Sequence, residues 1–125
     1  MSRASEIILL CEDRLQDMFV RRFLKQGWGI KEPRIRPVAY PHGGSGGAGE
    51  KHVRDNYPNQ LKAVRTRHAR TILIVVMDAD TGTVEEHRKE LERACSRVQP
   101  AVRVRQTNEA VIHVIPKRHI ETWLA

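Results

Sequence analysis

The chain is poor in cysteine and aromatic residues and lacks a long apolar run, and each shortage excludes a class of protein. Its 125 residues include two cysteines, Cys11 and Cys95, and neither lies in a CxxC motif or in a Cys/His spacing typical of zinc sites. Two Phe, two Tyr and two Trp are too few to predict a base-stacking platform. No apolar run reaches the roughly 20 residues that a membrane span needs, and Glu12 and Asp13 interrupt the N-terminal run too early for a signal peptide. We therefore expect a cytoplasmic protein with no membrane partner, whose two thiols are buried and structural.

Basic residues outnumber acidic residues by 22 to 15, which gives a formal net charge of +7. Such an excess in a cytoplasmic domain indicates a polyanionic partner, usually nucleic acid, although a merely soluble basic surface is an equal alternative. Because aromatic residues are scarce, contacts to phosphates should dominate any such interface. The length and the hydrophobic content of 40% suit one domain, residues 1–125.

Two short runs of apolar, β-branched residues predict strands that are covered on both faces. They occupy residues 6–11 and 71–77, and uniformly apolar runs of this length are typical of a parallel sheet. Each run stops abruptly at carboxylates, at Glu12 in the first case and at Asp78 and Asp80 in the second. This coincidence is the central feature of the sequence.

Three other stretches have the apolar spacing of amphipathic helices. They are residues 14–26, 50–67 and 83–98. Thr83 and Glu86 fit a capping box at the start of the third helix. Pro58 is expected to break the second stretch into two helices, because proline lacks the backbone N–H that an interior helical position donates.

The remaining segments give weaker signals. Residues 35–40 predict a strand that Pro37 confines to the edge of a sheet. Residues 111–115 predict the last strand, whereas the alternation in residues 101–105 leaves a strand and a loop both open. Residues 119–125 predict the first turns of a further helix.

Strands that alternate with helices imply a parallel sheet with right-handed crossovers. We expect an α/β fold of the three-layer Rossmann-like class, with about four mainly parallel strands flanked by helices. If the second strand lies on one side of the first and the third strand lies on the other, the winding reverses between the first and third strands. Ligands bind at such a switch point, and Glu12 and Asp78 would then occupy neighbouring strand ends.

A lone Asp-x-Asp pattern is more often helix capping or turn chemistry than metal binding. The pairing with Glu12 changes this balance, because three carboxylates at one sheet edge repel each other unless a positive charge compensates them. A hard divalent cation with oxygen ligands supplies that charge, and Mg²⁺ typically takes a few carboxylates together with waters and substrate phosphate. Glu12, Asp78 and Asp80 are therefore the candidate metal and catalytic residues.

These residues resemble the Toprim domain, which carries a glutamate after its first strand and an Asp-x-Asp motif after its third. The domain occurs in topoisomerases, bacterial primases, recombination-mediator proteins, small ribosomal-RNA maturases and overcoming-lysogenization-defect (OLD) nucleases. The resemblance implies the Toprim fold, acid/base work for Glu12, and Mg²⁺ (or Mn²⁺) held by Asp78 and Asp80. One departure is Asp13, where the family commonly has glycine. Asp13 either joins the metal cluster or begins the helix, and we favour the helix.

The closing segment, residues 115–125, is similar to small stand-alone Toprim-like proteins of bacterial defence loci. In these proteins a proline at the strand end precedes a Glu-x-Trp-Leu helix start, as Pro116 precedes Glu121 here. The resemblance implies that Glu121 is an additional metal ligand. The alternative, an acid in a first helical turn that is favoured by the helix dipole, is equally open.

Glycines and cations surround the predicted strand ends. Gly44, Gly46 and Gly49 spell GxGxxG, for which a flexible connector is favoured over a phosphate contact or a nucleotide site. Four cations that follow the second and fourth strands are the candidate nucleic-acid-binding residues: Lys51, Arg54, Lys117 and Arg118. Four others are expected to form a solvated helix face: Lys62, Arg65, Arg67 and Arg70. Four histidines show no metal-binding spacing: His42, His68, His87 and His113.

The leading hypothesis is an Mg²⁺-dependent nuclease, in phage defence or DNA repair, that hydrolyses phosphodiesters, with DNA favoured over RNA. The alternatives are a non-catalytic Toprim-like subunit that binds DNA or protein, and a nucleotide-binding regulator that uses the glycine loop. Expected partners are nucleic acid, an ATPase or other defence-system subunit, and a second copy of the chain. A homodimer would bury four aromatic residues that suit a core equally well: Phe19, Phe23, Trp28 and Trp123.

Overall fold

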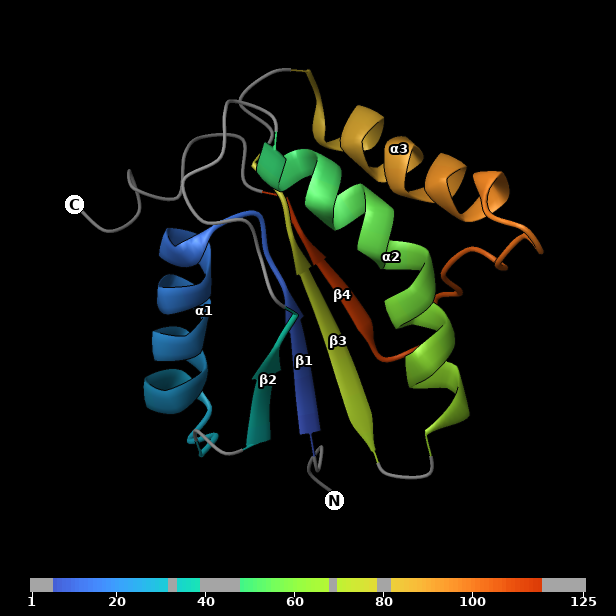
Figure 1. Ribbon diagram of the computed structural model, residues 1–125. Helices are drawn as coiled ribbons and strands as arrows, with labels where there is room; N and C mark the ends of the chain where they lie inside the picture. Colours follow the sequence, from blue (N-terminus) through green and yellow to red (C-terminus); the bar gives the residue numbers. More distant parts are fainter. Residues whose placement is uncertain (1–5, 32–33, 39–47, 68–69, 79–81, 116–125) are drawn as a thin grey trace.

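Alternating strands and helices build a parallel sheet with helices on both faces in the computed structural model (Figure 1). The structure describes residues 6–31, 34–38, 48–67, 70–78 and 82–115. Its elements, in chain order, are β1 (Glu6–Leu10), α1 (Arg14–Gly27), β2 (Ile35–Pro37), α2 (Ala48–Thr66), β3 (Thr71–Val76), α3 (Val84–Arg97) and β4 (Val111–Val114). The predicted helix at residues 119–125 lies outside the described residues.

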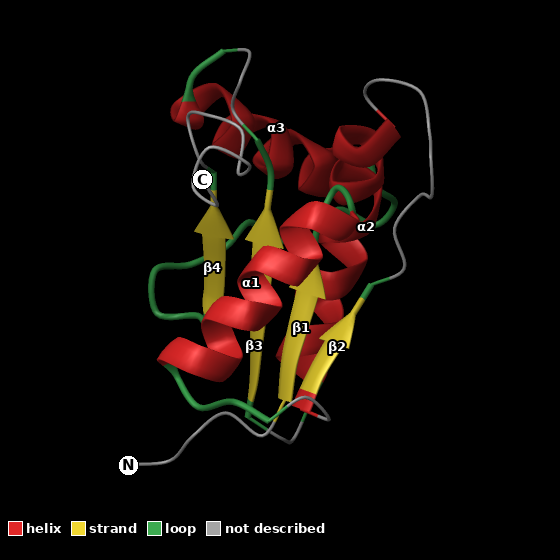
Figure 2. Ribbon diagram, turned by 90° about the vertical axis from the view of Figure 1, so that its left-hand side faces the viewer, coloured by secondary structure: helices red, strands yellow, loops and turns green. Residues whose placement is uncertain are grey.

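The four strands are ordered β2-β1-β3-β4 and all neighbours pair in parallel. β2 lies on one side of β1 and β3 lies on the other, so the predicted switch point between the first and third strands is confirmed. α1 covers one face of the sheet, and α2 and α3 cover the other (Figures 1 and 2). The fold is therefore a three-layer Rossmann-like α/β fold, and the edge position predicted for the second strand is confirmed.

The uniformly apolar strands are explained by a core on each face of the sheet. Along β1, Ile7 and Leu9 pack on the α1 side, with Val20 and Leu24. The alternate residues of β1, Ile8 and Leu10, pack on the side of α2 and α3. Their buried partners on these two helices are Val53, Tyr57, Leu61, Leu91 and Cys95. Because successive side chains of a strand point to opposite faces, a strand between two helix layers is apolar at every position.

Side-chain caps begin two of the helices. The Asp13 side chain accepts a hydrogen bond of 3.0 Å from the backbone N–H of Gln16, so Asp13 starts α1, as the sequence favoured. Thr83 accepts in the same way from the backbone N–H of Glu86, at 3.1 Å, and begins α3 as predicted. Both caps lie immediately before the first helical turn and satisfy N–H groups that have no partner inside a helix.

The predicted break at Pro58 is wrong, because α2 is one helix from Ala48 to Thr66. Proline removes one hydrogen bond from the helix interior, but Pro58 is buried and its neighbour Tyr57 is 1% exposed. The Tyr57 hydroxyl also lies 2.9 Å from His113 Nε2 on β4. Packing against the sheet on either side of Pro58 thus outweighs the cost of the missing bond.

Residues 101–105 form no strand, and the last turn of α2 holds this segment instead. Arg65 donates hydrogen bonds to the backbone oxygens of Arg103 (2.7 Å) and Val104 (3.0 Å) and to both carboxylate oxygens of Glu109 (2.6 and 2.9 Å). The expectation that Arg65 lies on a solvated face is therefore wrong. Arg67 likewise pairs with Glu6.

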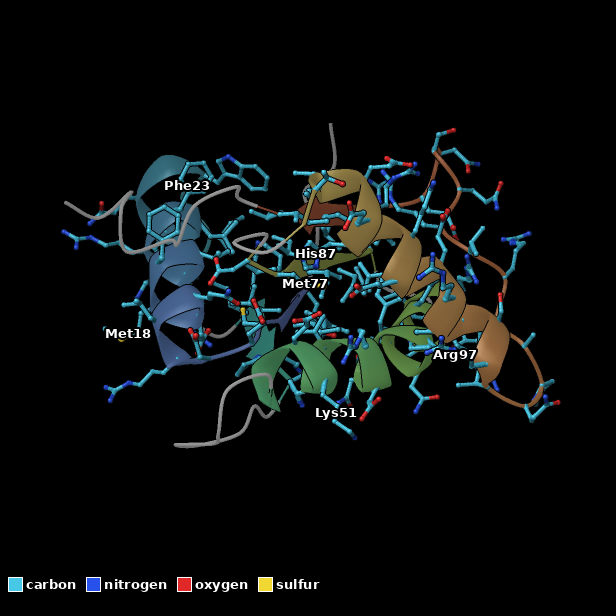
Figure 3. The ribbon with its side chains drawn as sticks, turned by 90° about the horizontal axis from the view of Figure 1, so that it is seen from above. Met18, Phe23, Lys51, Met77, His87 and Arg97 are labelled. Carbon is cyan, nitrogen blue, oxygen red and sulfur yellow. The ribbon has the colours of Figure 1, made fainter. Side chains whose placement is uncertain are left out.

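An apolar groove runs between α1 and the exposed face of β4, with a volume of about 370 Å³. Phe23 and Trp28 line it and are 54% and 47% exposed, with their rings in edge-to-face contact. Figure 3 shows Met18 on the outer side of α1 and Phe23 further along the same helix. Within the described part of the chain, none of the helices combines the length and the apolar composition that crossing a membrane requires.

Candidate metal centre at the carboxyl edge of the sheet

Glu12 and Asp78 meet at the carboxyl edge of the sheet. They follow β1 and β3, which are neighbours with Leu10 paired to Val75. The backbone N–H of Asp78 donates a hydrogen bond of 2.6 Å to Glu12 Oε1. The structure therefore places the Glu12 side chain against the backbone of Asp78, 66 positions further along the chain, at the shared edge of the parallel strands.

Gln16 fixes the position of Glu12 through two hydrogen bonds. Its side-chain Nε2 donates to Glu12 Oε1 at 2.9 Å, and its Oε1 accepts from the Glu12 backbone N–H at 2.8 Å. Gln16 is fully buried, so this pairing is shielded from water. The sequence analysis missed Gln16, although it precedes the buried Val20 and Leu24 by four and eight positions and thus lies on the buried face of α1.

The charges around Glu12 are negative. Burial raises the pKa of the Glu12 carboxyl above its ordinary value, and the carboxylates of Asp78 and Glu50 raise it further. The hydrogen bonds from the Asp78 backbone and from Gln16 act in the opposite direction and stabilise the ionised form. Carboxylate oxygens, such as those that Glu12 and Asp78 carry at this edge, are the ligands that a hard divalent cation prefers.

The start of α2 lies against Glu12 because residue 49 is glycine. A Cβ atom at Gly49 would lie 2.6 Å from the Glu12 carbonyl oxygen and 2.8 Å from the Glu12 Cβ, which is too close for any other residue without a backbone shift. The third glycine of the GxGxxG pattern therefore has a packing role. Gly44 and Gly46 lie outside the described residues.

A second group of possible metal ligands lies between the first turns of α2 and α3. Glu50, His87 and Glu90 each offer one ligand atom, and these atoms lie within 4.8 Å of one another. The prediction that the histidines have no metal-binding arrangement is therefore incomplete for His87. Glu50 belongs to α2, and Glu90 lies one turn after His87 on α3. No short sequence motif therefore contains all three residues.

Two of the four predicted nucleic-acid-binding residues lie in the described part of α2. Lys51 is exposed and pairs with Asp55 at 2.7 Å, one turn further along the helix. The guanidinium of Arg54 lies 3.3 Å from Glu50 Oε1 and 3.5 Å from Glu90 Oε2. Arg54 therefore faces acids of this chain as well as solvent.

Four other predicted site residues lie outside the described residues: Asp80, Lys117, Arg118 and Glu121. Their roles, and the Toprim resemblance itself, stay predictions. No protein-family model, curated protein or solved structure matches the chain.

Proposed function

We propose that this protein is an Mg²⁺-dependent nuclease that hydrolyses nucleic-acid phosphodiesters in phage defence or DNA repair, with DNA as the favoured substrate. The observation that carries the proposal is the meeting of Glu12 and Asp78 at the switch point of a parallel sheet. This is where ligands bind in open α/β sheets. The net charge of +7 supports a polyanionic substrate.

The residues fit a magnesium ion by their chemistry. Asp78 and Asp80, with Glu12, would hold the cation through carboxylate oxygens, and the sequence resemblance adds Glu121. Mn²⁺ accepts the same oxygen donors. When bound, the cation supplies polarisation of a phosphoryl oxygen and stabilisation of the leaving group.

Glu12 is the candidate general base. A general base must be held in a fixed direction within reach of the water that it activates. Gln16 and the Asp78 backbone both bind Oε1, so these bonds set the direction of the other oxygen, Oε2. In this position Glu12 orients or deprotonates an attacking water, and its proton is later returned to solvent.

The test is cleavage of plasmid DNA and of RNA with Mg²⁺ or Mn²⁺. We expect Glu12→Gln and Asp78→Asn each to lower the cleavage rate by about 100-fold or more, because each removes a carboxylate charge with little change of shape. Glu85→Gln, which removes an exposed carboxylate from α3, is the matched control and should cleave at the wild-type rate. Equal rates for wild type and Asp78→Asn would reject the nuclease proposal.

A non-catalytic subunit that binds DNA or protein is the second candidate, and the excess of basic residues favours it without requiring any chemistry. Its signature is nucleic-acid binding by wild type and Asp78→Asn alike, with no cleavage by either. Whether the protein is a nuclease or a non-catalytic subunit, an ATPase or other defence-system subunit would be a further partner.

A further inference from the structure

Glu50, His87 and Glu90 are held by the two helices that cover one face of the sheet. Glu50 lies in the first turn of α2, and His87 and Glu90 lie on successive turns at the start of α3. Figure 3 looks down on the carboxyl ends of the strands and labels His87 on α3 and Met77, the residue that follows β3. The three side chains thus converge from two helices, α2 and α3.

Two carboxylates of this cluster face each other in a half-buried place. One oxygen of Glu50 and one of Glu90 lie within 4.8 Å of each other. The Arg54 guanidinium, 3.3 Å from Glu50 Oε1 and 3.5 Å from Glu90 Oε2, compensates part of their charge. Two such carboxylates share a proton or bind a cation.

His87 adds a nitrogen ligand to these oxygens. Its side chain is almost completely buried, at 3% exposure for the residue, and its Nδ1 lies 3.9 Å from Glu90 Oε2. That separation is longer than a hydrogen bond and close to the roughly 3.4 Å between two ligands of one ion with bonds of about 2.1 Å. Gly82, at φ +82°, lets the chain after β3 turn beside this histidine.

We propose that Glu50, His87 and Glu90 form a binding site for a divalent first-row transition metal of the Zn²⁺ type, separate from the carboxylate site at Glu12 and Asp78. One imidazole and two carboxylates suit Zn²⁺ better than Mg²⁺, which prefers oxygen ligands only. The ion joins α2 to α3. The site stands or falls independently of the nuclease activity.

The experiment uses the untagged, chelator-treated full chain carrying Asp78→Asn, which disables the other carboxylate site. Co²⁺ serves as the probe because it replaces Zn²⁺ and because its visible absorption becomes much stronger when protein ligands hold it in a four- or five-coordinate site than in water. We expect one Co²⁺ per chain, displaced by Zn²⁺ but not by an equal concentration of Mg²⁺. The melting temperature should rise with Zn²⁺, as for any ligand that binds only the folded state.

Adding Glu90→Gln or Glu50→Gln to this background should weaken Co²⁺ binding about tenfold or more. Glu92→Gln, which removes a neighbouring carboxylate of α3, should leave it unchanged. Circular dichroism identifies any variant that fails to fold, and the two glutamine variants do not disturb the buried histidine. Absence of Co²⁺ absorption bands, or bands that survive both substitutions, would overturn the metal site and leave an ion-pair network with Arg54. Neither result affects the nuclease test.

Discussion

At the scale of single residues, Gly49 and Gln16 do the most to determine where the Glu12 carboxylate lies. Gly49 sets how closely α2 approaches, since a Cβ there would collide with backbone rather than with a flexible side chain. Gln16 sets the direction of the carboxylate through its hydrogen bonds. Both residues are uncharged, so they influence Glu12 by fixing its position rather than by adding a charge beside it.

Gly49→Ala should destabilise the fold by about 1–3 kcal/mol, the usual cost of forcing extra atoms into a packed place. It should also lower nuclease activity, because α2 has to move away from Glu12. Urea unfolding and the cleavage assay measure the two effects. Gly27→Ala is the matched control: its Cβ would make an ordinary 3.8 Å contact with the Phe23 ring, and it should change stability by less than about 1 kcal/mol. Equal effects at the two positions would argue against the close approach.

Gln16→Met keeps the length of the side chain but removes both hydrogen bonds to Glu12. We expect a loss of about 1–3 kcal/mol in unfolding free energy, because a buried N–H loses its partner, and a fall in kcat of about 10-fold or more with little change in KM. Steady-state kinetics on a short duplex separate these quantities. A change confined to KM would show that Gln16 does not position the base.

At the scale of elements, the end of α2 and the segment before β4 are joined by the Arg65–Glu109 pair. The hydrogen bonds from Arg65 lower the pKa of Glu109 to about 2, from an ordinary value of 4.5. A carboxyl whose pKa is lower in the folded state stabilises the fold fully above pH 4.5, and this contribution is lost as the pH falls toward 2.

Glu109→Gln should therefore lower the unfolding free energy at pH 7 and flatten its decline between about pH 4.5 and 2. Urea unfolding of wild type and variant across this range is the measurement. His113, whose pKa burial lowers to about 4, remains in both proteins and weakens both as the pH falls from about 6.5 to 4. Parallel curves for the two proteins below pH 4.5 would contradict the assigned role of the pair.

At the scale of the whole molecule, the charge of +7 predicts salt-dependent binding to nucleic acid. Each phosphate that a cation neutralises contributes about 0.9 to the slope of log K against log salt concentration. Lys51→Gln should lower that slope by about 1. Arg54→Gln should lower it less, because Arg54 is less exposed and faces two carboxylates, Glu50 and Glu90, whereas the exposed Lys51 pairs with one exposed carboxylate, Asp55. Fluorescence anisotropy with labelled DNA at several salt concentrations tests this, and equal slopes for all three proteins would exclude both residues from the interface.

The sequence by itself determined most of the strands and helices, the edge position of β2 and the placement of Glu12 and Asp78 at the same edge of the sheet. These follow from patterns within short segments and from one rule, that parallel strands end at the same edge of a sheet. Pro58 shows the limit of such local reasoning, since the packing of α2 on the sheet overrode its helix-breaking tendency.

Only the tertiary structure decided which polar side chains meet across elements. Periodicity assigns a residue to a face of a helix, but the partners of that face depend on how two helices are placed and rotated on the sheet. The cluster of Glu50, His87 and Glu90 and the partners of Arg65 are set by that placement. A displacement of a few ångströms would separate these atoms and leave the hydrophobic pattern unchanged, which is why the pattern could not predict them.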